Sequence, residues 1–231
     1  MKSLFALTAI PLSLASSLAF SQVIDVKITN LTQGIHFTPL LVAAHADTTD
    51  VFEVGTAATA ELQAMAEGGD ISGLVAALPA GSVSSENPAQ GLLAPAQSVT
   101  VNDLDTGDMT NLSIVAMLLP TNDGFVGLDS WSIPSTAGTY DIYLNAYDAG
   151  TEANNEIING AGAPGALGIP AAPANNGGTG ATGVTTDESN QSVHIHRGNV
   201  GDTDAEGGLS DVDSRIHRWL NPVAKVTVTV K

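Results

Sequence analysis

Cysteine is absent from this chain of 231 residues, and basic residues are scarce. The lack of cysteine excludes disulfide bonds and thiolate chemistry, so the fold must rely on its core. Seven Lys and Arg residues face 24 Asp and Glu residues, which gives a formal net charge of −17. Such a charge favours solubility and cations, and it repels nucleic acid phosphates and anionic lipid surfaces. We therefore expect no nucleic-acid partner.

Aromatic residues make up only 4% of the chain, with two Trp among them. A cleft that stacks sugar rings is hard to build from so few, although paired carboxylates are the catalytic groups of glycosidases. The chain also has no G-x-S-x-G elbow, no H-E-x-x-H motif and no P-loop. We predict a non-enzymatic protein, and the alternative is an extracellular hydrolase that uses acidic loops.

The first 21 residues have the pattern of a signal peptide. Met1 and Lys2 form a short basic start, residues 3–20 are an uncharged apolar run, and the small residues Ala19 and Ser21 precede a cleavage point before Gln22. An uncleaved anchor is the alternative, for which the run is barely long enough. No later stretch is apolar enough to span a bilayer. We expect residues 22–231 to be secreted or periplasmic, without membrane insertion.

The exported part reads as one all-β domain with one or two short helices. Residues 56–67 are Ala-rich and predict a helix with Thr56 as its N-cap and Gly68-Gly69 as its stop, and residues 71–78 could add a turn or two. Short strands separated by turn residues indicate an antiparallel β-sandwich. The predicted strands are 26–29, 37–44 (an edge strand, or one that begins at Leu40 after Pro39), 98–101, 112–119, 139–146, 193–196 and 223–230.

Residues 160–183 form a long stretch rich in Gly, Ala and Pro. The stretch has few large side chains and no hydrophobic period, so it offers little to a core. Too little chain follows it to build a second domain. We therefore predict a flexible loop between two strands, mobile and dispensable for folding.

Two acidic clusters follow predicted strands. Residues 121–129 come after the strand that ends at Leu119-Pro120, and residues 147–152 come directly after strand 139–146. If these strands are neighbours, the loops meet at one end of the sandwich. Asp148 and Glu152, four residues apart across a Gly turn, could then share one ion with Asp123. Calcium takes six to eight oxygen ligands of this kind. The alternative is two solvated acidic turns.

The same two clusters resemble the paired signature of the spondin N-terminal domain. The segments D-G-F-V-G-L (123–128) and Y-D-A-G-T-E (147–152) are similar to the Pro-Asp-Trp-x-Val-Gly and Asp-Ala-Gly-Thr-Asp segments of matrix spondins. The resemblance extends more weakly from about Val26 to the end of the chain, through I-T-N-L-T (28–32), F-T-P (37–39), F-E-V-G (52–55) and W-L-N-P-V-A (219–224).

The resemblance implies a C2-like antiparallel β-sandwich, an adhesive or ligand-binding role and a bound calcium ion. Carried over onto this sequence, the calcium carboxylates of the family fall on Asp123, Asp148 and Glu152. Glu152 stands where matrix spondins have Asp, Gly124 stands where they have Trp, and the cysteines of the animal proteins are missing. The implied partner is an extracellular protein or a glycan.

Two further groups could bind metal. Residues 202–213 fit an EF-hand loop at the first, third, sixth and eighth positions, but they lack the terminal Glu and a preceding helix. His194 and His196 lie on one face of a predicted strand, and His217 could join them to hold copper or zinc. In both cases the alternative is an ordinary structural or exposed segment.

Overall fold

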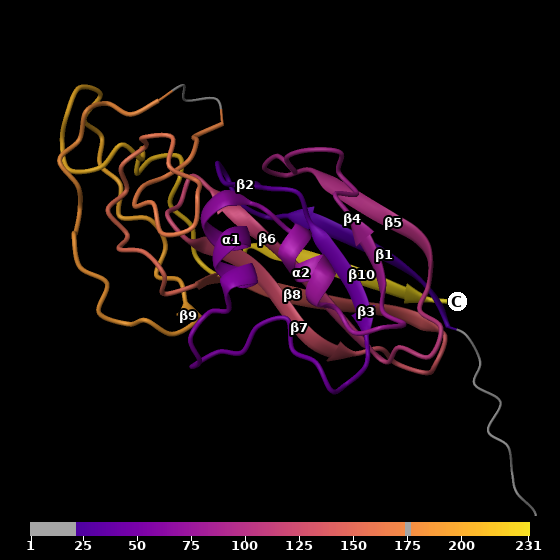
Figure 1. The fold of residues 1–231 in the computed structure, drawn as a ribbon. Coiled ribbons are helices and arrows are strands. Elements are labelled where there is room, and N and C mark those ends of the chain that lie inside the picture. Colours follow the sequence, from indigo (N-terminus) through magenta and orange to yellow (C-terminus); the bar gives the residue numbers. More distant parts are fainter. Residues whose placement is uncertain (1–21, 174–176) are drawn as a thin grey trace, which may run out of the picture.

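The computed structural model describes residues 22–173 and 177–231. The predicted signal peptide, residues 1–21, lies outside the described residues. Figure 1 shows a body of strands and, at one end of it, a lobe of loops formed by the chain between β8 and β10. No helix within the described ranges is long and apolar enough to cross a membrane.

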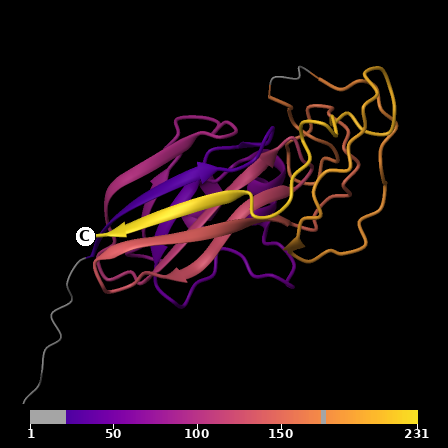
Figure 2. The same cartoon turned by 180° about the vertical axis from the view of Figure 1, so that it is seen from behind.

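The predicted antiparallel β-sandwich is confirmed. One sheet runs in the order β4-β3-β6-β7-β8-β10-β1-β5, with β2 attached to β6 and β9 attached to β8. It folds on itself so that its two halves enclose a core (Figures 1 and 2). The strands are β1 (Val23–Asn30), β2 (His36–Phe37), β3 (Leu41–His45), β4 (Val83–Glu86), β5 (Ser98–Asp105), β6 (Asn111–Leu119), β7 (Gly124–Ser132), β8 (Gly138–Asp148), β9 (His194–Ile195) and β10 (Ala224–Val230).

The central strand β6 is buried along its whole length. One face, with Ile114 and Ala116, packs in the core between the two halves of the sheet. The other face, with Val115 and Met117, packs under the helices. Because both faces are covered, β6 reads as a continuous apolar run, whereas β10 alternates between buried and half-exposed residues.

The predicted helix begins one turn later than expected. Helix α1 (Ala60–Gly68) has Thr59 as its N-cap, because the Thr59 side chain accepts a hydrogen bond from the Leu62 N–H. The Thr56 hydroxyl donates instead to the Glu53 carbonyl. The predicted stop is confirmed, since Gly69 adopts the left-handed conformation with φ of 73°. Helix α2 (Ser72–Ala77) follows, and the two helices lie over β3 and β6.

Two strand predictions need correction. The prediction of an edge strand over residues 37–44 is wrong, because β3 lies inside the sheet between β4 and β6. The alternative, a strand that begins after Pro39, is correct, since β3 starts at Leu41 and Pro39 separates it from β2. Residues 121–129 are not one loop, because β7 starts at Gly124 directly after a tight turn. The acidic and glycine residues of this segment hide the strand pattern. β4 is also not predicted from the sequence.

The glycine at position 127 in β7 makes room for an aromatic cluster. The Phe52 ring lies 5.1 Å from that of Phe125 and 5.0 Å from that of Tyr147, measured between centroids. A Cβ atom at Gly127 would lie 2.6 Å from the Phe52 ring. Only glycine therefore lets the segment before α1 pack on β7 and β8.

The Gly-rich stretch 160–183 contains no helix or strand in its described residues, but it has anchors. The Ile169 side chain is fully buried. The Gly165 N–H donates to the Glu67 carboxylate of α1, and the Gly168 N–H donates to Glu152. Mobility of this stretch stays a prediction, and these contacts argue against its being dispensable for folding.

We predict that Gly127→Ala lowers the free energy of unfolding by about 1–3 kcal/mol, the usual effect of overpacking a core. Chemical denaturation measures the loss. The penalty should shrink in a Phe52→Leu background, because the ring that meets the new methyl group is gone. Equal penalties in both backgrounds would show that Phe52 does not impose the glycine.

Candidate functional site

The two acidic segments meet at the end of the sandwich where the lobe begins. β7 pairs with β8, and in this register Gly124 lies opposite Asp148. The turn before β7 and the chain after β8 are therefore adjacent, as the sequence predicts for neighbouring strands. The Ala149 N–H donates to the Asp123 carbonyl at 3.2 Å and continues the pairing beyond the strands.

Asp123 joins the turn to the lobe. Its Oδ2 accepts hydrogen bonds from the N–H groups of Thr151 and Glu152, at 2.8 and 3.1 Å, and from the Thr151 hydroxyl at 3.2 Å. Its Oδ1 is buried and accepts no hydrogen bond from any described residue. Oδ2 thus has a structural role, and Oδ1 is available to bind a ligand.

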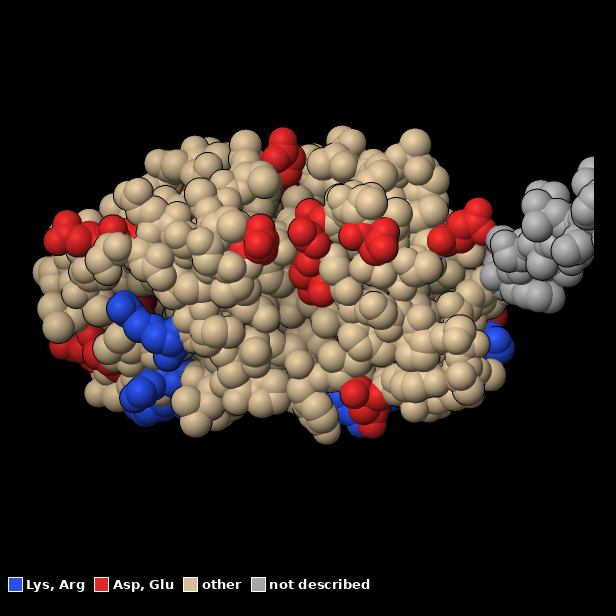
Figure 3. Space-filling view, turned by 90° about the horizontal axis from the view of Figure 1, so that it is seen from below, with Lys and Arg blue, Asp and Glu red and all other residues tan. Residues whose placement is uncertain are grey.

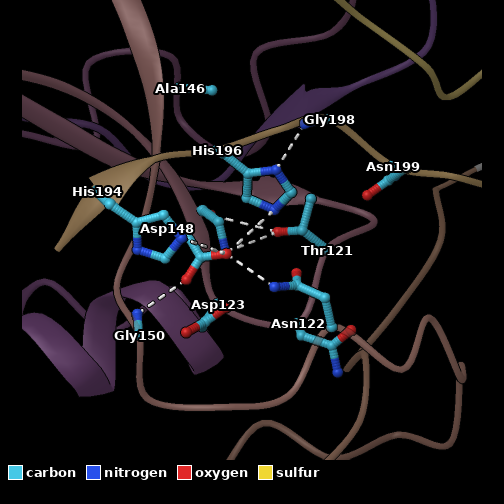
Figure 4. Close-up of polar contacts among 12 residues, drawn as sticks. Thr121, Asn122, Asp123, Ala146, Asp148, Gly150, His194, His196, Gly198 and Asn199 are labelled. Atoms are coloured by element: carbon cyan, nitrogen blue, oxygen red, sulfur yellow. Dashed lines mark hydrogen bonds and ion pairs between the residues drawn. The ribbon is translucent and has the colours of Figure 1, made fainter. Parts of the chain in front are cut away.

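Asp148 lies at the end of β8 among polar neighbours (Figure 4). Its Oδ1 accepts from the Gly150 N–H at 2.9 Å, and its Oδ2 accepts from the Asn154 amide at 2.7 Å. Two imidazoles approach the same Oδ2, with the Nε2 atoms of His194 and His196 at 3.8 and 3.9 Å. Both distances are too long for hydrogen bonds.

Glu152 lies on the side of the cluster toward α1. Its Oε2 accepts from the Asn122 amide at 3.1 Å and from the Gly168 N–H at 2.9 Å, while Oε1 accepts no N–H or hydroxyl donor from the described residues. Burial is the main cause of the raised pKa of Glu152, and the buried carboxyl group of Glu67 adds to it through its charge and through a hydrogen bond with Glu152. The structure thus brings Asp123 close enough to Asp148 and Glu152 for their charges to interact, and Glu152 in turn interacts with Glu67.

Burial and repulsion between acids dominate the electrostatics of this cluster. Burial, followed by the charge of Asp148, raises the pKa of Asp123 to about 8, although two N–H donors oppose the shift. Burial raises the pKa of Glu152 to about 7, and Glu67 adds to this effect. A cation in the cluster would reverse both shifts.

The three carboxylates do not form a finished metal site. Across residues 22–173 and 177–231, no group of three or more His, Cys, Asp or Glu side chains is arranged so that it could hold a metal ion. The chemistry of the donors nevertheless fits a hard cation. Two buried carboxylate oxygens, Asp123 Oδ1 and Glu152 Oε1, accept no N–H or hydroxyl donor from the described residues, and calcium also accepts carbonyl and water ligands.

The histidines divide between two places. His194 and His196 both face Asp148, so the predicted pair lies at the carboxylate cluster. His217 does not join them. It lines a cleft of about 360 Å³ together with His36, Asp213 and Ile216.

The acidic loop 202–213 uses its carboxylates internally. Asp202 accepts hydrogen bonds from the N–H groups of Asp204, Leu209 and Ser210. Asp211 accepts from Ile158, Thr179 and Ala181. Because N–H donors already surround these oxygens, the EF-hand reading has little structural support.

Two buried carboxylates near the cluster are not predicted from the sequence. Glu67 belongs to an ordinary amphipathic helix, and the residues next to it in the sequence form no recognisable motif. Glu156 adopts a left-handed backbone with φ of 57°, and its side chain accepts from the Val200 and Gly201 N–H groups and from the Ser210 hydroxyl. No local sequence motif marks either glutamate, because the groups that donate hydrogen bonds to them from the lobe are distant in the sequence.

Comparison with known protein families gives a match. The family model Spondin_N matches residues 28–157, more than half of the chain. The matched region contains Asp123, Asp148 and Glu152 and ends before His194. No curated protein matches this sequence.

We predict that the chelator-treated protein loses stability as pH rises from 6.5 to 8.5. The folded state holds the protons of Glu152 and Asp123 up to about pH 7 and 8, whereas the unfolded state releases them near 4.5 and 3.8. The stabilisation is therefore complete at low pH, and it is lost as the pH rises through the folded-state pKa values of the two groups. Thermal melts at fixed ionic strength measure it.

Burial lowers the pKa of His36, His196 and His217, and these groups oppose the trend only at lower pH. Burial lowers the pKa of His196 to about 4, so its contribution changes below pH 6.5. Asp123→Asn should remove the part of the fall near pH 8, and Asp187→Asn, at an exposed position in the lobe, should not. A melting temperature that is level or rises over this window would contradict the prediction.

Proposed function

The chain belongs to the spondin N-terminal domain family, and on this basis we propose that it is an exported, calcium-dependent binding module that catalyses no reaction. The observation that supports calcium most directly is the pair of buried, unpartnered carboxylate oxygens at Asp123 and Glu152, next to Asp148. Such atoms are costly to bury without a partner, and a cation is the partner that carboxylates lack here.

Calcium would act as a clamp between the body and the lobe. Asp123 comes from the turn before β7, whereas Asp148 and Glu152 come from the end of β8 and the chain after it. These three side chains would hold the ion, with carbonyl oxygens and water as the remaining ligands. The ion would neutralise the repulsion that otherwise favours protonation of Asp123 and Glu152.

Burial favours a structural ion over a catalytic centre. Asp123, Asp148 and Glu152 are 0, 1 and 5% exposed, so a polymer substrate has no access to them. Surface clefts of about 450 and 480 Å³ are lined by other residues. The hydrolase alternative requires a cleft that reaches the carboxylates, and these clefts do not supply one.

The surface best suited to an extracellular partner lies along β7 and β8. A groove of about 450 Å³ there is lined by aromatic rings and carboxylates, and its Tyr143 is 60% exposed. The lower side of the molecule, along β7 and the chain before α1, has acidic side chains spread over its middle (Figure 3). A positively charged protein or glycan ligand would complement this surface. The residues that line the groove are Asp50, Phe52, Glu53, Val54, Gly127, Leu128, Asp129, Tyr143, Asn145 and Tyr147.

We predict that calcium raises the melting temperature and that Asp148→Asn abolishes most of this shift. Calcium at about 100 times its dissociation constant adds roughly 2.7 kcal/mol to the stability. For a domain of this size that corresponds to about 5–10 °C. Magnesium should give less, because it requires a smaller octahedral shell and sheds water reluctantly. Thermal melts with chelator, with calcium and with magnesium measure the shift.

The matched control is Asp204→Asn in the acidic loop 202–213. Its side chain is exposed and makes one hydrogen bond that Asn can also accept, so the calcium shift should persist. Asp211 is a poorer control, since its buried oxygens accept several N–H groups. Identical melting temperatures of the wild type with chelator and with calcium would refute the proposal. Loss of the calcium shift in Asp204→Asn but not in Asp148→Asn would show that calcium binds in the loop 202–213 instead.

A further inference from the structure

The two imidazoles beside Asp148 differ in their tautomers, that is, in which ring nitrogen has the hydrogen. His194 Nδ1 lies 2.8 Å from the Ser192 carbonyl oxygen. A carbonyl can only accept, so Nδ1 of the neutral ring is the protonated nitrogen and Nε2 has a free lone pair. A histidine that ligates a metal through one nitrogen usually donates its other N–H to such a carbonyl. His194 is therefore arranged as a metal ligand.

His196 has the opposite tautomer. The Gly198 N–H donates to its Nδ1 at 2.9 Å, so that nitrogen accepts and Nε2 has the hydrogen. Nε2 is buried and has no hydrogen-bond partner within the described chain. Its N–H points toward Asp148 at 3.9 Å (Figure 4). While the Gly198 contact persists, His196 can support the Asp148 carboxylate but cannot ligate a metal through Nε2.

The facing atoms of His194 and Asp148 are both acceptors. Nε2 and Oδ2 are 3.8 Å apart, with no proton available between them in the neutral tautomer. A tetrahedral zinc ion lies about 2.1 Å from nitrogen and oxygen ligands, which places two such ligands about 3.4 Å apart. A change of a few tenths of an ångström brings both atoms to one ion. The side chain of His194 is 32% exposed, so an ion can enter from solvent.

We propose that His194 and Asp148 bind a first-row transition-metal ion, which makes the carboxylate cluster a mixed nitrogen and oxygen site open to zinc as well as calcium. This inference rests on the proposed calcium function insofar as both ions use Asp148. Imidazole nitrogen suits zinc, copper and nickel, whereas calcium takes oxygen ligands. The protein supplies these two side chains, and water fills the remaining positions, since no third His, Cys, Asp or Glu side chain in the described residues is arranged with them to hold a metal ion.

His194 enters the site through backbone pairing. β9 consists of two residues, and its pairing with β8 sets His194 opposite Asp148 and Ile195 opposite Tyr147. The family match ends at residue 157, so this nitrogen ligand comes from a part of the chain beyond the matched region. The family match therefore does not by itself predict zinc binding.

Isothermal titration of the chelator-treated mature protein with Zn²⁺ and, separately, with Ca²⁺ tests the proposal. His194→Gln should weaken zinc binding at least tenfold and leave calcium binding within about twofold, because it removes a nitrogen that calcium does not use. Asp148→Asn should weaken both. His36→Gln, in the cleft away from the cluster, should change neither. Melts in chelator establish that each variant is folded.

The outcomes separate the two proposals. Unchanged zinc binding in His194→Gln, or calcium binding without zinc binding in the wild type, overturns this inference and leaves the calcium function standing. Zinc binding that depends on His194 without any calcium binding overturns the calcium function alone. Imidazole ¹⁵N spectra give an independent measure, since His194 Nε2 should shift when zinc is added. A doubly protonated His194 ring at pH 7.5 with zinc present would identify an ion pair with Asp148 instead.

Discussion

The carboxylate of Asp123 is the contact on which this end of the molecule depends. Through Oδ2 it accepts N–H groups from Thr151 and Glu152, and so it fixes the first residues of the lobe to the turn before β7. The lobe has almost no regular structure beyond β9, so few of its N–H groups are paired in strand ladders. Isolated backbone hydrogen bonds satisfy some of the others, and buried carboxylates accept several more. Glu156 and Asp211 serve the residues near 157, 180 and 200 in the same way.

The acidic residues of the chain therefore fall into two groups with opposite electrostatics. Hydrogen bonds from N–H groups lower the pKa of Asp202. Around Asp211 such bonds outweigh the effect of burial and also lower its pKa, so both carboxylates are stable as anions. Burial instead raises the pKa of Asp123 and Glu152, each of which keeps one oxygen without a donor. Carboxylates of the first group hold the lobe together. The second group is neutral while it holds its protons, and as anions these carboxylates would be stabilised by a cation, which is the electrostatic pattern of a candidate ligand site.

Local sequence patterns predict most of the body and only part of the site. Alternation identifies β8 and β10, and the Gly68-Gly69 pair identifies the end of α1, because these signals depend on neighbouring residues. β7 escapes prediction, since Gly127 is there to admit the Phe52 ring from a distant segment. The adjacency of Asp123 and Asp148 follows from strand ends in the sequence. The approach of Glu67 to Glu152 and the tautomers of the two histidines depend on contacts that no local pattern contains.

Strand register determines which part of the chain supplies each side chain of the site. The pairing of β7 with β8 sets Asp148 opposite Gly124, and it lies within the region that matches the family. The pairing of β8 with β9 adds His194, and it depends on a lobe that the match does not cover. A chain that keeps the first pairing and replaces the lobe would keep its carboxylates and lose the imidazole. Its site would then offer oxygen ligands alone, which suit hard cations.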